Sequence, residues 1–249
     1  GNKVEVFMTT DEKGDILPKI GPGKAKEFSG QIKMISLNDN YMSVLCDDKV
    51  HLIDLQKDTT EKIFPIKDTE DKIIFISMTD DYLIYSDSKC HVKIFAIVDN
   101  CNMVGDYKFD HVIKKIFPND NGTKYICIDE LGKVLVYSPV TETVLQIYDE
   151  LPGNFNRAIW DKDDPNVFIG IDNTNTKVYS FNLILNSLQG PYIRTLKEMD
   201  YLEDLDNEKV NPIVTTLDNG SYPVLLESGS LFVFHKQDKE TSNVILNSC

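Results

Sequence analysis

The chain has 249 residues, of which 41% are hydrophobic and 10% aromatic, and its formal net charge is −14. This apolar fraction is enough for a folded core and excludes global disorder. The acidic charge repels phosphate backbones and anionic lipid, and no run approaches the ~18 apolar residues that a membrane helix needs. We therefore expect no nucleic-acid binding and no direct membrane insertion.

Short apolar runs with a common marker recur along the chain. In chain order the marker pairs are Val4 and Phe7, Val50 and Ile53, Val92 and Phe95, Val134 and Tyr137, Val178 and Phe181, and Leu231 and Phe234. The second members are separated by 46, 42, 42, 44 and 53 residues. A period of about 40–45 residues with several short strands per unit is typical of WD-type β-propeller blades.

The remainder of each unit agrees with this interpretation. Two apolar runs precede each marker, as in IIFISM and YLIYS before Val92, and turn sequences such as NDN, TDD and PNDNG separate them. A more polar run follows the marker, as expected for an outer strand whose edge meets solvent. Four antiparallel strands, ordered from the centre outward, would form one blade.

The sequence therefore predicts an all-β fold, a single WD-type propeller over residues 1–249 with about five and a half four-stranded blades. The predicted parts are a half blade at 1–28, blades at 29–72, 73–110, 111–150, 151–197 and 209–249, and an acidic insertion at 198–208. The chain starts with Gly1 rather than Met, in the middle of an apolar run, so we interpret it as part of a longer protein. Whether the ring is incomplete stays open.

One histidine matches the WD pattern. Asp110-His111 resembles the Gly-His step that opens a WD blade. In typical WD repeats such a histidine joins a hydrogen-bond network with an aspartate between the second and third strands, and Asp129 is placed for that role. We therefore predict a structural role for both His111 and Asp129.

The longest marker spacing contains the acidic insertion KEMDYLEDLDNEK. Met199, Leu202 and Leu205 recur at three-residue spacing, which gives a short helix or turn one apolar edge. Two interpretations stay open: a solvated insertion, or a partner-binding loop whose contacts would be Met199, Tyr201, Leu202 and Leu205.

Catalytic, cofactor and metal motifs are incomplete. Gly21–Lys24 resembles the end of a phosphate-binding loop, but Pro18 and Ala25 replace the required Gly and Ser/Thr. Asp161, Asp163 and Asp164 begin like a calcium loop, but the later ligands do not follow, so a turn is favoured. Five cysteines without paired spacing indicate a reducing, cytoplasmic compartment. We expect no enzyme activity, cofactor, metal or small-molecule substrate.

Several segments resemble a known family. Residues 112–140, 167–181 and 80–109, together with the opening NKVEVFM, are similar to the WD-repeat subunit of intraflagellar transport complex A. That subunit has two tandem propellers followed by a helical array, and the similarity corresponds to the second propeller, strongest from Tyr82 to Phe181.

The resemblance implies a non-catalytic scaffold. Its partners would be other subunits of complex A, its location the cytoplasm, the cilium and the ciliary base, and its role retrograde transport and the entry of membrane proteins into cilia. Two alternatives stay open. A coat or nucleoporin-like propeller would share the architecture, and a propeller glycoside hydrolase would need two carboxylates at a fixed distance in a cleft.

Overall fold

A computed structural model describes residues 1–6, 24–56, 61–65, 71–147, 155–161, 164–172, 177–184, 187–189, 210–212, 221–226 and 231–235. Every regular element in these ranges is a β-strand. A search of the same residues finds no helix with the length and hydropathy to cross a membrane. The all-β prediction is confirmed.

The strands form successive antiparallel sheets, each made of strands that follow one another in the chain. The sheets are β1 (Lys3–Val6) and β2 (Lys24–Glu27); β3 (Ile32–Leu37), β4 (Tyr41–Cys46), β5 (Lys49–Asp54) and β6 (Glu61–Phe64); β7 (Ile73–Met78), β8 (Tyr82–Asp87), β9 (His91–Ala96) and β10 (Asn102–Lys108); β11 (Ile113–Pro118), β12 (Tyr125–Asp129), β13 (Val134–Ser138) and β14 (Thr143–Gln146); β15 (Phe155–Trp160), β16 (Val167–Asp172), β17 (Lys177–Asn182) and β18 (Ser187–Gln189); and β19 (Val210–Pro212), β20 (Ser221–Leu226) and β21 (Leu231–His235).

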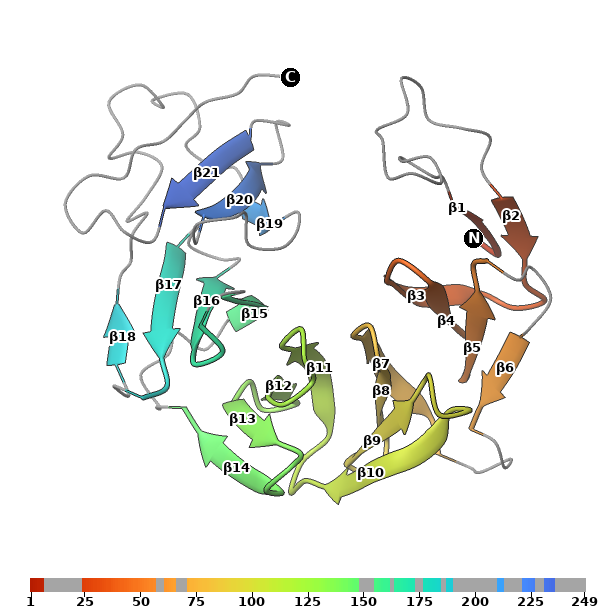
Figure 1. Ribbon diagram of the computed structural model, residues 1–249, viewed down its shortest axis with the longest axis horizontal. Helices are drawn as coiled ribbons and strands as arrows, with labels where there is room; N and C mark the ends of the chain where they lie inside the picture. Colours follow the sequence, from red (N-terminus) through yellow and green to blue (C-terminus); the bar gives the residue numbers. More distant parts are fainter. Residues whose placement is uncertain are drawn as a thin grey trace.

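The sheets follow one another around a common centre, as the blades of a propeller do (Figure 1). The first strands β3, β7, β11 and β15 lie toward the centre, and the fourth strands β6, β10, β14 and β18 lie at the periphery (Figure 1). Each sheet falls within one predicted blade range, while the boundaries of the blades and their total number stay predictions.

Four of the marker residues lie in the third strands β5, β9, β13 and β17 and have buried side chains. Ile53, Phe95, Tyr137 and Phe181 expose 7%, 4%, 2% and 1% of their surface. Each pairs with a residue of the second strand at the same register, for example Tyr137 with Tyr125 and Phe181 with Phe168. A common register explains why one residue of each unit repeats so regularly along the sequence.

The second strands are the most buried, whereas the first strands are half exposed. All five residues of β12 are buried, and in β8 all but Tyr82 are. The first strand β3 alternates between half-buried and exposed positions, whereas β7 has two buried residues and four half-buried ones. Both runs before the marker are apolar in sequence, but only the second strand is covered on both faces.

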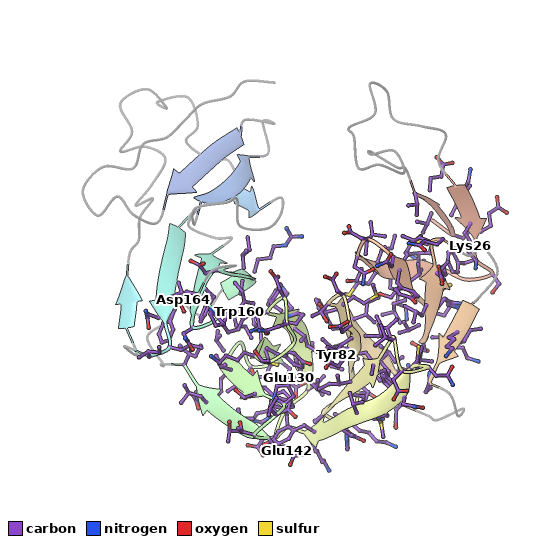
Figure 2. All side chains as sticks on the ribbon, viewed as in Figure 1. Lys26, Tyr82, Glu130, Glu142, Trp160 and Asp164 are labelled. Carbon is purple, nitrogen blue, oxygen red and sulfur yellow. The ribbon has the colours of Figure 1, made fainter. Side chains whose placement is uncertain are left out.

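The cores lie between neighbouring sheets. Leu45, Val50 and Leu52 of one sheet pack with Ile76, Leu83 and Phe95 of the next. The same arrangement recurs between the next two pairs of sheets, and Trp160 lies in the last of these interfaces (Figure 2). Burial of each such side chain contributes roughly 1.5–3 kcal/mol, so every blade depends on its neighbour for stability.

Polar contacts also join neighbouring blades. The Asn38 side-chain amide donates to the Thr79 carbonyl oxygen at 2.9 Å, and the Trp160 Nε1–H donates to the Phe117 carbonyl oxygen at 2.8 Å. The buried Ser86 hydroxyl donates to the Ile113 carbonyl oxygen at 2.7 Å. These bonds join the four sheets from β3–β6 to β15–β18 in succession, each to the next.

Candidate functional site

A β-bulge occurs at the same place in four first strands. The pairing register shifts between Ile32 and Met34 in β3, between Ile73 and Phe75 in β7, between Ile113 and Lys115 in β11, and between Phe155 and Arg157 in β15. A bulge inserts one residue and redirects the side chains that follow it.

The residues that follow the four bulges line one cavity at the centre of the ring. The cavity has a volume of about 520 Å³, and its lining residues are Met34, Ile35, Ser36, Phe75, Ile76, Ser77, Lys115, Ile116, Phe117 and Arg157. All of them belong to β3, β7, β11 or β15, so the inner strands alone form the described wall. We name this space the central cavity.

The central cavity has an apolar half and a cationic half. Met34 and Phe75 hold the position after the bulge in β3 and β7, whereas Lys115 and Arg157 hold it in β11 and β15. Burial lowers the pKa of Lys115, and the positive charge of Arg157 lowers it further. Two cations therefore lie close together in the middle of an acidic chain.

Asp129 holds the turn between β12 and β13. It is 4% exposed, and its Oδ1 accepts hydrogen bonds from the N–H groups of Leu131 at 2.9 Å and Lys133 at 2.8 Å. Asp87 holds the same register in the preceding blade and accepts from the N–H groups of Lys89 and His91. These carboxylates order the turn by local hydrogen bonds.

His111 and Asp129 line a shared cavity of about 310 Å³ beside β10, β13 and β14. The structure therefore brings the two residues of the predicted network to one place. The hydrogen-bond network itself stays a prediction. The proposed partner-binding residues Met199, Tyr201, Leu202 and Leu205 and the acidic insertion at 198–208 lie outside the described residues.

The segment that resembles a calcium loop includes a hydrogen-bonded turn. Asp161 is 4% exposed, and its Oδ1 accepts the N–H of Asp164 at 3.1 Å. The Asp164 carboxylate in turn accepts the N–H of Asn166 at 3.0 Å. A search of the described part of the chain finds no group of three or more His, Cys, Asp or Glu residues arranged to hold a metal ion.

Lys115 and Arg157 were missed in the sequence because a strand with period two gives no sign of a bulge. Superposing VIKKIF on NRAIW would have placed the two cations at one repeat position. Their equivalent positions on two first strands, which lie toward the centre of the ring, are the signal that could have found them.

Comparison with known families gives one match over almost the whole chain. The family model described as the second β-propeller of WDR19 matches residues 2–249. The chain is 32% identical over 176 residues to WD repeat-containing protein 19 of Homo sapiens and 31% identical to that of Mus musculus. These alignments cover 67% of this chain and 13% of each relative, so the match spans a small part of the relatives' length.

Solved propellers share the fold at low identity. The β-propeller domain of Cps50 (Swd1) from Myceliophteria thermophila superposes with a TM-score of 0.61 at 12% identity, covering 84% of this chain and 72% of that one. Hsv2 from Kluyvelomyces marxianus gives a TM-score of 0.58 at 13% identity, covering 89% and 68%. At such identities the likeness shows the propeller fold alone.

Proposed function

The chain belongs to the family of WDR19 second β-propellers, and from this premise we propose that it is a non-catalytic protein-interaction scaffold of intraflagellar transport complex A. The observation that carries the proposal is the family match over residues 2–249, together with at least 31% identity to two WD repeat-containing proteins. More specifically, we propose that this scaffold supports retrograde ciliary transport and the entry of membrane proteins into cilia.

The physical character of the fold supports a scaffold. Apolar cores lie between successive blades, and hydrogen bonds such as Asn38 to Thr79 join them. A stiff frame presents its loops and outer strands in fixed positions, which lowers the entropic cost of binding a partner. We therefore propose other complex A subunits as partners, and the cytoplasm, the cilium and the ciliary base as the location.

The outer strands supply accessible apolar surface for such contacts. Met103 and Val104 of β10 are 56% and 55% exposed, and Leu145 of β14 is 51% exposed. Outer strands also have an edge at which another strand can pair. A protein partner suits this surface better than a small molecule, because a broad convex rim does not enclose a ligand.

Affinity capture tests the proposal directly. The tagged full-length protein is expressed in ciliated cells and captured, and the recovered proteins are identified by mass spectrometry. The control is the same protein without residues 1–249. We expect other complex A subunits in the first sample, with a loss of some of them in the control. Recovery of coat or nuclear-pore subunits instead, or identical recovery in both samples, would contradict the proposal.

A further inference from the structure

Three successive blades carry an exposed apolar side chain at one repeat position. Val98, Val140 and Ile184 lie three residues after the buried marker residue of their blade, where the third strand turns toward the fourth strand at the periphery (Figure 1). They are 75%, 80% and 73% exposed, more than any other large apolar side chain among the described residues. A single exposed apolar residue is ordinary, but one repeat position that stays apolar in three neighbouring blades forms a row.

Backbone hydrogen bonds hold this row in place. The N–H of Ile97 donates to the carbonyl oxygen of Asp81, and the N–H of Leu183 donates to that of Asn166, each at 2.8 Å. These bonds join the turn after the third strand to the turn between the first and second strands. Because successive strands are antiparallel, both turns lie at the same end of a blade. Valine and isoleucine are β-branched and have few rotamers, so a partner that covers them removes little side-chain entropy.

The same end of the blades is acidic. In the sheets β7–β10 and β11–β14 its turns are residues 79–81, 97–101, 119–124 and 139–142, all of which the structure describes. The charged side chains of these turns are five exposed acids and one half-buried lysine: Asp80, Asp81, Asp99, Asp120, Glu142 and Lys124. The Lys124 ammonium donates to the Pro165 carbonyl oxygen and the Asn166 side-chain oxygen, which carry no charge.

The opposite end of the same two sheets has balanced charge. Its turns 88–90 and 130–133 and the connection 109–112 contain Lys89 and Lys133, together with the acids Asp110 and Glu130. An excess of negative charge is therefore confined to the end that presents Val98 and Val140. We name that end, with Ile184 of the next blade, the apolar–acidic face.

We propose that the apolar–acidic face docks a segment of a partner subunit in which Lys or Arg side chains adjoin apolar ones. The apolar side chains cover Val98, Val140 and Ile184, and the cations lie against Asp99 and Glu142, since complementary charge fixes the position of such a segment. Nucleic acid and anionic lipid do not fit this face, because its carboxylates repel phosphate. This inference rests on the scaffold function proposed above and names the chemistry of one partner segment.

A peptide-binding measurement on the purified full-length protein tests the inference. The probe is the peptide Gly-Lys-Val-Leu-Lys-Arg-Val-Leu-Lys-Gly with a zwitterionic rhodamine dye, and the readout is fluorescence anisotropy. We expect saturable binding that weakens with added salt, because the contacting carboxylates are exposed. Val98→Ser and Val140→Ser should each weaken binding about three- to tenfold, since each removes a branched apolar side chain from the contact. Asp99→Asn combined with Glu142→Gln should weaken binding and lower its dependence on salt.

Matched controls lie at the opposite end of the blades. Leu131→Ser removes an apolar side chain that is 61% exposed in the turn between β12 and β13, and Asp110→Asn removes an exposed carboxylate between β10 and β11. Both should leave the affinity unchanged, and thermal unfolding verifies the fold of every variant. No saturable binding to the wild-type protein, equal binding of a peptide with Glu in place of each Lys and Arg, or equal weakening by Leu131→Ser would overturn the inference.

Affinity capture from ciliated cells distinguishes this inference from the scaffold proposal. The triple variant Val98→Ser, Val140→Ser and Ile184→Ser should recover less of at least one complex A subunit than the wild-type protein does. Unchanged recovery by the triple variant would overturn the assignment of the apolar–acidic face and leave the scaffold in place. Failure of the wild-type protein to recover any such subunit would overturn the scaffold, whatever the peptide measurement gives.

Discussion

Ile35 and Ile76 hold the same register position in the first strands of neighbouring blades, but Ile35 is 46% exposed and Ile76 is 2% exposed. Ile76 packs against Leu45 and Leu52 of the preceding blade. The sheet that precedes β3 is described only as β1 and β2, which take the places of a third and a fourth strand. Residues of this sheet and of the segment that follows it pack against Val44, farther out in the blade, and not against Ile35. The difference shows that a first strand is buried by the second and third strands of the preceding blade.

This relationship predicts unequal costs for one substitution. Ile76→Ala should lower the free energy of unfolding by about 2–5 kcal/mol, because it leaves a cavity between two sheets. Ile35→Ala should cost less than about 1 kcal/mol, because its side chain is already half exposed. Urea unfolding of the two variants measures the difference. Equal costs would mean that Ile35 is covered in the native protein.

Gly122 and Tyr82 give a second test of blade packing. Gly122 lies in the hairpin between β11 and β12 with φ +67°, and a Cβ built there would lie 2.7 Å from the Cδ2 atom of Tyr82 in the preceding blade. Gly122→Ala should destabilise the protein by about 1–3 kcal/mol, through the positive φ and the clash with the ring.

A double-mutant cycle separates these two causes. With Tyr82→Ala as the partner, the combined cost should be smaller than the sum of the single costs, because the ring that clashes is gone. Denaturant unfolding of all four proteins provides the free energies. Strict additivity would show that the hairpin and Tyr82 do not meet.

The hydrogen bonds of Asp129 predict that the loss of stability depends on which residue replaces it. Asp129→Ala removes the acceptor for two N–H groups and should cost about 1–3 kcal/mol, whereas Asp129→Asn keeps an acceptor oxygen and should cost less. Asp120→Ala, at an exposed turn position, is the matched control and should change stability very little. The midpoint of urea unfolding gives the order. An Asp129→Ala protein as stable as the control would contradict the role of Asp129 in the turn.

Tyr137 predicts a loss of stability at alkaline pH. Burial, chiefly, raises the pKa of its hydroxyl from 10.0 to about 12. The folded state therefore holds this proton more tightly than the unfolded state does. Stability from this group is complete below pH 10 and falls as the pH rises toward 12. Tyr137→Phe should make the decline shallower over this interval, as measured by denaturant unfolding at each pH. An unchanged slope would contradict the assignment.

Much of the fold was predictable because the residues that repeat along the sequence lie in the buried strands. Tyr125 pairs with Tyr137 across adjacent strands, and at the same register Leu83 pairs with Phe95 and Phe168 pairs with Phe181. The 42-residue spacing of Phe95 and Tyr137 thus corresponds to one blade. Side chains that fill the space between sheets must repeat wherever the sheets repeat.

The central cavity could not be predicted in the same way. An extra residue in a strand changes the face that Lys115 presents, and the alternation of apolar and polar residues does not locate that extra residue. The exposure of Ile35 could not be predicted either, because it depends on the preceding sheet and not on the residues of β3. Both features arise from packing between blades.

Cross-linking of the intact assembly tests whether this propeller contacts other subunits. The full-length protein is captured from ciliated cells under native conditions and treated with a lysine-reactive cross-linker, and the linked peptides are identified by mass spectrometry. We predict links from lysines of this propeller, such as Lys108 on β10, to other subunits of complex A. A complete assembly in which every link from residues 1–249 stays within its own chain would contradict a scaffold role for this propeller.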